Sequence, residues 1–148
     1  MPMTCPHRAT PVYLPDGRRI LASGVFERTS EDEVPDFGLY AYEGWRPAWP
    51  AAFIDWVDFG LPVDTREASR LIVDAFDRVR SGQTVEIGCH AGNGRTGSII
   101  ACMAILAGTP AEEAVEWTRS HYCLHAIDTS EQERWVAAFE PGSTTRFS

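Results

Sequence analysis

Cys89 and Arg95 lie in one short glycine-rich stretch, GCHAGNGRTGS, at residues 88–98. Its three internal glycines relax the backbone, so that successive N–H groups can turn inward around an anion. The guanidinium of arginine presents a planar fork of donors that matches two oxygens of a phosphate group. A thiol beside such positive groups favours the thiolate form, which is a nucleophile. The stretch therefore predicts a phosphate cradle with a nucleophile at its floor.

A plainer interpretation of the same stretch is a tight turn that contains a buried cysteine by chance. Glycine-rich turns between a strand and a helix are common, so the glycines alone do not exclude it. A nucleotide-binding P-loop does not fit, because no Lys-Ser/Thr pair follows the glycines. Five residues separate Cys89 from Arg95, and Thr96 follows directly with a hydroxyl that can donate to a thiolate. This spacing favours chemistry over chance.

The elements on either side would place this stretch where ligands bind in α/β proteins. QTVEIGC, residues 83–89, is typical of a buried strand, and TGSIIACMAILAG, residues 96–108, of a largely buried helix. The amino end of a helix adds a positive field from its unpaired N–H groups and its dipole. Ligands of open α/β sheets lie beyond the carboxyl ends of the strands. The cradle is therefore expected at a strand-to-helix turn.

The rest of the chain predicts an alternation of strands and helices. The first dozen residues contain several breakers and are expected to wrap the surface. Asp64 can cap a helix, with Glu67 reaching back to the cap. The pattern predicts strands at 18–26, 38–44 and around Phe53–Trp56, and helices at 64–82, after Thr109 and after Thr129. This order predicts an α/β fold with a central, mostly parallel, twisted sheet flanked by helices.

Composition limits the classes of function. The 148 residues suit a single domain spanning 1–148. A net charge of -8 argues against nucleic-acid partners and anionic membrane surfaces. No apolar run spans a bilayer and no signal-peptide core is present, so a cytoplasmic location is expected. The cysteines and histidines lack metal-ligand spacing, so no metal site is expected.

Three motifs in order resemble the cysteine-based protein tyrosine phosphatase superfamily. The run from Cys89 to Thr96 is similar to its signature, especially in the dual-specificity, tensin-like and Cdc14-like branches. DWVDFGLP, residues 55–62, resembles the family's mobile acid loop, although Val57 replaces the usual proline. AIDTSEQERWV, residues 126–136, is similar to the segment with the glutamine of the second chemical step. Small actinobacterial phosphatase-like proteins are the nearest resemblance. The low-molecular-weight branch is less similar, because it places its acid after the cysteine, whereas Asp58 precedes Cys89.

The resemblance implies metal-independent hydrolysis of phosphate monoesters through a cysteinyl-phosphate intermediate, with phosphotyrosine or dual specificity. The substrate would be a phosphorylated protein or a small phosphomonoester. The implied catalytic residues are Cys89 as nucleophile, Arg95 on the phosphate, Asp58 as acid and then base, Thr96 at the sulfur and Gln132 at the attacking water. The implied phosphate-binding residues are His90, Ala91, Gly92, Asn93, Gly94 and Arg95. Lysines occupy the positions of His90 and Asn93 in phosphoinositide-specific relatives, so an inositol lipid is disfavoured.

Departures from the family pattern keep an alternative function open. Gly88 stands where the family has a histidine that orders the loop, and with Val57 it motivates a phosphate-binding pseudophosphatase without turnover. A sulfurtransferase also places a cysteine in an anion-binding loop, but the Asp58 segment argues against it. Asp55 and Asp64 compete with Asp58 for the acid role.

Other candidate residues have structural interpretations as well. Gln132 stands three residues after Thr129 and could simply complete a helix capping box. Cys123 is a candidate resolving thiol, although an ordinary buried cysteine is the favoured interpretation. Three aromatic residues could line a substrate entrance, with core packing as the favoured interpretation: Tyr42, Trp45 and Trp49.

Overall fold

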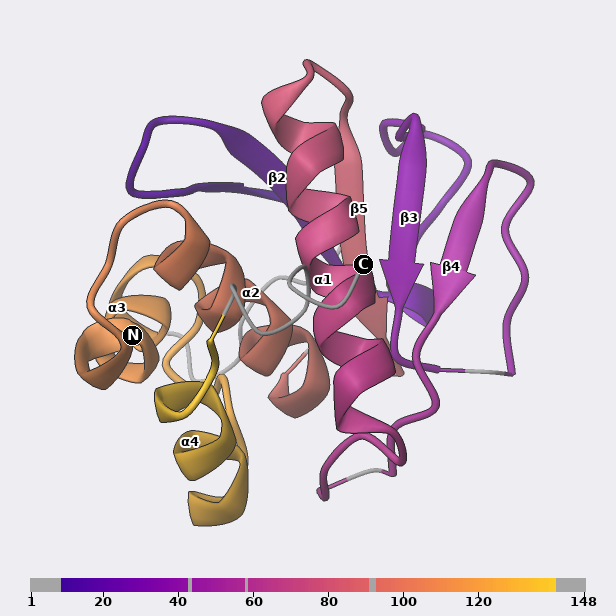
Figure 1. Ribbon diagram of the computed structural model, residues 1–148. Coiled ribbons are helices and arrows are strands. Elements are labelled where there is room, and N and C mark those ends of the chain that lie inside the picture. The colour runs from indigo at the N-terminus through magenta and orange to yellow at the C-terminus, as the bar shows by residue number, and fades with distance from the viewer. Residues whose placement is uncertain (1–8, 43, 58, 91–92, 141–148) are drawn as a thin grey trace.

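The computed structural model describes residues 9–42, 44–57, 59–90 and 93–140. Within them the chain forms one five-stranded sheet with helices packed against it (Figure 1). The strands are β1 Thr10–Tyr13, β2 Arg19–Gly24, β3 Phe37–Tyr40, β4 Ala51–Phe53 and β5 Val85–Cys89. The helices are α1 Thr65–Arg80, α2 Gly94–Leu106, α3 Ala114–His121 and α4 Ser130–Ala137, with short 3-10 turns η1 Val25–Glu27 and η2 Ala111–Glu113.

The sheet order is β1-β2-β5-β3-β4, so β5 lies at its centre. β5 pairs in parallel with β2 and with β3, and β3 pairs in parallel with β4. Only the β1–β2 pair among these ladders is antiparallel. All five residues of β5 are buried, as expected for a parallel strand covered on both faces. The predicted mostly parallel α/β sheet is confirmed.

Helix α2 is the most deeply buried helix of the described chain. Every residue from Gly94 to Ala104 is buried, and the helix packs against β5 and the other three helices. Helix α1 crosses in front of β5 in Figure 1 and also contacts β3. It buries an apolar face formed by Ile72, Ala75, Phe76 and Val79. Within the described residues, no helix has the length and apolarity needed to cross a bilayer. The sheet and α1 therefore hold α2 in a fixed position against β5.

Two expectations about the elements are wrong. The first dozen residues do not only wrap the surface, because Thr10–Tyr13 pairs with β2 as an edge strand and buries Val12. Pro11 is tolerated there because an edge strand leaves one side of its backbone unpaired. The helix expected after Thr109 begins only at Ala114, following the 3-10 turn of η2. Pairing with β2 thus outweighs the strand-breaking residues near the start of the chain. The 3-10 turn η2 takes the place of the first helical turn expected after Thr109.

Asp64 caps the amino end of α1, as its sequence position predicts. Its carboxylate accepts hydrogen bonds from the N–H groups of Arg66 and Glu67, each at 3.1 Å. The side chain of Glu67 does not reach back to the cap. It binds Arg70 instead, at 3.0 and 2.7 Å.

We expect Asp64→Ala to lower the free energy of unfolding by about 1 kcal/mol, because two N–H groups lose their acceptor. Urea unfolding followed by tryptophan fluorescence measures the change. Asp77→Ala is the matched control, since this exposed aspartate stands near the carboxyl end of α1, where its charge opposes the helix dipole. Equal stability of Asp64→Ala and the wild type would contradict the capping role.

Candidate functional site

Cys89 is the last residue of β5, and α2 begins five residues later at Gly94. The cysteine is buried with 2% of its surface exposed. The Thr96 hydroxyl, in the first turn of α2, donates to the Cys89 sulfur at 2.9 Å. The turn between a buried strand and a buried helix therefore brings together the thiol and the hydroxyl that the sequence predicts as partners.

Arg95 also lies in the first turn of α2, and its side chain is largely buried. One terminal nitrogen, Nη1, donates to the backbone carbonyl of Trp56 at 3.3 Å. Trp56 belongs to the segment that resembles an acid loop. Arg95 thus brings this segment, which lies 39 residues earlier in the chain, to the amino end of α2.

The segment 55–62 forms a closed loop. Trp56 and Pro62 form an isolated antiparallel bridge at its base. The indole N–H of Trp56 donates to the Gly60 carbonyl across the loop at 2.8 Å. Asp58, the predicted acid, lies outside the described residues. Val57 and Phe59 on either side of it are exposed, so the loop presents an apolar surface beside its predicted acid.

Gln132 connects α4 to this loop. Its side chain is fully buried, its Nε2 donates to the Gly60 carbonyl at 2.9 Å, and its Oε1 accepts from the Asp128 N–H at 2.8 Å. The Thr129 hydroxyl accepts from the Gln132 N–H at 3.1 Å and caps α4. Thr129 therefore caps α4, as the capping-box interpretation expects. The side-chain amide of Gln132, however, binds the loop and the Asp128 backbone.

Comparisons with known proteins define the fold. No family model matches the chain. Two uncharacterized proteins of Methanocaldococcus jannaschii, MJECL20 and MJ0215, are 37% and 35% identical over 91 residues, which is 61% of this chain. The match covers 59% and 55% of those two proteins, so this chain spans less than two thirds of their length.

Solved structures match over a larger share of the chain. Tk-PTP in its active form has a TM-score of 0.61 at 23% identity, over 72% of this chain and 78% of that one. PTPMT1 in complex with PI(5)P has a TM-score of 0.61 at 19% identity, over 76% and 80%. The phosphatase domain of Yvh1 from Chaetomium thermophilum has a TM-score of 0.54 at 19% identity, over 69% and 76%. The chain has the protein tyrosine phosphatase fold.

The turn of this phosphatase fold carries the predicted phosphate-binding residues. Ala91 and Gly92 lie outside the described residues. Asn93 is half-buried at the amino end of α2, and Gly94 is buried against the carboxylate of Asp128, which occupies the space of any Cβ there. Since a side chain at position 94 would collide with Asp128, the close approach of the two segments requires glycine.

His90 is exposed at the rim of the turn and contacts two aromatic side chains. Its ring lies 5.3 Å from Phe26 and 5.4 Å from Tyr42, measured between ring centroids. Tyr42 therefore contacts the exposed His90, and its role at a substrate entrance stays a prediction. Phe26 is a residue near the turn that the sequence motifs did not single out. It follows β2, whose parallel pairing with β5 places Gly24 opposite Cys89. Its position after a strand parallel to β5 could have indicated it, because the carboxyl ends of neighbouring parallel strands lie at the same edge of the sheet.

Trp45 and Trp49 do not reach the rim and pack on Tyr40. The ring of Trp45 lies 4.9 Å from Tyr40 and 5.9 Å from Trp49. The indole N–H of Trp49 donates to the Tyr40 hydroxyl at 2.8 Å. For these two tryptophans the favoured interpretation as packing residues agrees with the geometry.

Tyr122 is a second residue near the thiol that the motifs did not assign. Burial raises the pKa of its phenol, and the negative charges of Cys89 and Glu27 raise it further. The phenol therefore stays protonated near the sulfur. The neighbouring Cys123 is buried and disulfide-bonded, so it is not a free thiol in this structure. Its sulfur lies 3.9 Å from Asn93 Oδ1.

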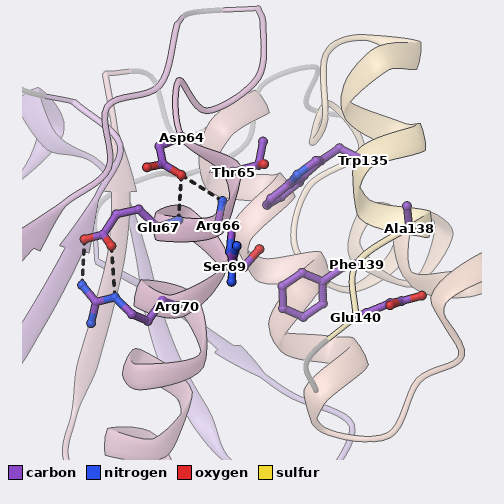
Figure 2. A pocket seen from close by; sticks show the side chains of 10 residues that line it. All are labelled: Asp64, Thr65, Arg66, Glu67, Ser69, Arg70, Trp135, Ala138, Phe139 and Glu140. Atoms are coloured by element: carbon purple, nitrogen blue, oxygen red, sulfur yellow. Dashed lines mark hydrogen bonds and ion pairs between the residues drawn. The ribbon is translucent and has the colours of Figure 1, made fainter. Parts of the chain in front are cut away.

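A separate groove of about 560 Å³ lies between the start of α1 and the end of α4 (Figure 2). Trp135 and Phe139 face the first turn of α1 across it, with Arg66 and Glu140 at its margin. None of its lining residues belongs to the Cys89 turn. Trp135 nevertheless contacts the acid-loop Trp56, with ring centroids 5.4 Å apart. The groove is therefore behind the loop and is not the predicted phosphate cradle.

We expect Gln132→Met to lower the free energy of unfolding by about 1–3 kcal/mol, because it leaves the Gly60 carbonyl and the Asp128 N–H without their partner. Thermal or urea unfolding measures this loss. Gln83→Met, at a half-buried position after α1, is the matched control and should stay close to the wild type. A Gln132→Met protein as stable as this control would show that the contact with the loop contributes nothing to folding.

Proposed function

We propose that the protein hydrolyses phosphate monoesters without a metal ion, through a cysteinyl-phosphate intermediate. The observation that carries this proposal is the 2.9 Å hydrogen bond from the Thr96 hydroxyl to the Cys89 sulfur. It is found where a buried strand runs into a buried helix, with Arg95 in the same helical turn. A thiol, a hydroxyl that donates to its sulfur and an arginine are thus placed at one strand-to-helix turn.

The amino end of α2 and Arg95 would bind the phosphate. A helix amino end favours anions through its N–H groups and its dipole. Arg95 would exchange its 3.3 Å contact with the Trp56 carbonyl for oxygens of the phosphate, which accept charged hydrogen bonds more strongly. This exchange would link phosphate binding to the position of the acid loop.

In the first chemical step the Cys89 thiolate attacks phosphorus, an S–P bond forms, and the bond between phosphorus and the leaving oxygen breaks. Asp58 would give its proton to that oxygen. Arg95 would stabilise the charge on the equatorial oxygens in the transition state. The products are a free alcohol or phenol and the cysteinyl-phosphate.

In the second step a water attacks phosphorus while the Asp58 carboxylate takes its proton. The S–P bond breaks and the Thr96 hydroxyl stabilises the departing thiolate. Gln132 would position this water. Its amide binds Gly60 and Asp128 in this structure, so that role requires release from the Gly60 carbonyl.

The substrate class that we propose is a phosphorylated protein, with phosphotyrosine or dual specificity. The ring cluster of Phe26, Tyr42 and His90 beside Cys89 supports an aromatic phosphate ester, because ring edges and faces pack favourably on another ring. PTPMT1 is in complex with PI(5)P, but here His90 and Asn93 replace the lysines of phosphoinositide-specific relatives. An inositol lipid is therefore not our proposal.

A cytoplasmic location stays a prediction from the sequence. The proposed reaction needs a reduced thiol only at Cys89, which carries no disulfide.

We expect the wild type to hydrolyse p-nitrophenyl phosphate in EDTA between pH 5 and 8, and Cys89→Ser to be inactive. Asp58→Ala should lose on the order of 100-fold or more in kcat with a substrate whose leaving group needs a proton, such as a phosphotyrosine peptide. Steady-state kinetics measures both effects. Asp55→Ala is the matched control, because Asp55 is an exposed aspartate of the same loop and should keep its activity.

Full activity of Cys89→Ser would refute the cysteinyl-phosphate route. A folded wild type that binds a phosphotyrosine peptide but does not hydrolyse it would instead support the pseudophosphatase alternative. Loss of activity in Asp55→Ala with retention in Asp58→Ala would reassign the acid.

A further inference from the structure

Glu86 is a fully buried carboxylate in β5, three residues before Cys89. Its Oε1 accepts from the Tyr40 hydroxyl at 2.6 Å, and its Oε2 accepts from Arg28 Nε at 2.7 Å and from the Ser23 hydroxyl. A buried charge is costly unless a partner charge and hydrogen bonds compensate it. Here one cation and two hydroxyls do so.

Tyr40 connects this hydrogen-bond network to a second segment of the chain. Burial raises the pKa of its phenol, and the negative charge of Glu86 raises it further, so the hydroxyl stays protonated and donates to the carboxylate. The same oxygen accepts from the indole N–H of Trp49 at 2.8 Å. The bonds therefore run in one direction, from Trp49 through Tyr40 to Glu86.

The ring of Tyr40 lies over the residue that precedes Cys89. Tyr40 and Gly88 are partners in the β3–β5 ladder. A Cβ on Gly88 would lie 2.9 Å from Tyr40 Cδ1 and 3.1 Å from Val25 Cγ1. The ring thus fills the space that a side chain at position 88 would need. The phosphatase family that the motifs resemble has a histidine at this position.

The network also fixes the two connections that carry the aromatic rim. Arg28 follows η1, which contains Phe26, and its side chain is 7% exposed in the ion pair with Glu86. Trp49 belongs to the segment between β3 and β4, which contains Tyr42. Since Phe26 and Tyr42 contact His90, both sides of the rim are anchored to β5.

We propose that Glu86 is a positioning residue for the nucleophile. Through Tyr40 it holds the Gly88–Cys89 backbone, so that the Cys89 sulfur stays within reach of the Thr96 hydroxyl. This role replaces the ordering function of the missing histidine, and its catalytic consequence rests on the proposed phosphatase function. A contribution to stability alone would not need a charge, because apolar side chains fill a buried site as well as an ion pair does.

Tyr40→Phe tests the proposal while keeping the ring over Gly88, and Glu86→Gln tests it by removing the charge. The first readout is the alkylation rate of Cys89 by iodoacetamide at pH 7, followed by peptide mass spectrometry. Cys102 is an internal reference, because full burial raises the pKa of its thiol and keeps it neutral. The second readout is kcat and KM for p-nitrophenyl phosphate.

We expect both variants to lower the alkylation rate of Cys89 and kcat by about tenfold, with KM within about twofold, because a small misplacement of a reacting atom slows chemistry more than binding. Thr118→Val is the matched control. It removes another fully buried hydroxyl, which donates to the Ala114 carbonyl at 2.8 Å in α3. We expect it to lower Tm but to leave both Cys89 readouts unchanged.

The two readouts separate this proposal from the proposed function. Slower alkylation in Tyr40→Phe and Glu86→Gln, in a protein that hydrolyses no phosphate ester, would support the positioning role and refute the phosphatase. Cys89 alkylation at the same rate in the wild type, Tyr40→Phe, Glu86→Gln and Thr118→Val would overturn the positioning role, whatever the hydrolytic activity.

Discussion

The direct passage from strand β5 into helix α2 is the constraint on which the rest of the site depends. Both elements are buried, so neither the strand end at Cys89 nor the first helical turn at Arg95 and Thr96 can shift without disturbing the core. The 2.9 Å contact between the Thr96 hydroxyl and the Cys89 sulfur follows from this passage. A thiol, a hydroxyl and a guanidinium therefore meet at a helix amino end because of how the core is packed.

The acid-loop segment is held against this turn from two directions. Arg95 contacts the Trp56 carbonyl from α2, and Gln132 contacts the Gly60 carbonyl from α4. Both contacts use backbone oxygens of the loop, so they constrain its position without using its side chains. Arg95 and Gln132 are also the two residues that our mechanism needs elsewhere during turnover. Loop movement and phosphate chemistry would therefore exchange the same hydrogen bonds.

The other side of the sheet shows how a departure from the family pattern is accommodated. Gly88 leaves room for the ring of Tyr40, and Tyr40 in turn is bound to the buried charge of Glu86. Arg28 and Trp49 attach the two surrounding connections to this pair. A glycine next to the nucleophile is thus one member of a network, and its effect on the loop cannot be judged from position 88 alone.

The sequence by itself determined the local features of this protein. The cap at Asp64, the apolar face of α1, the buried strand before Cys89 and the spacing of Cys89, Arg95 and Thr96 follow from periodicity, caps and motif spacing within one or two turns of chain. The tertiary structure decided which distant residues meet. Arg28 and Glu86 are 58 residues apart, Tyr40 and Glu86 are 46 apart, and Gln132 and Gly60 are 72 apart. Such pairs depend on which strands become neighbours and on how connections fold over the sheet. No local pattern encodes them, because each partner alone satisfies an ordinary strand, loop or helix position.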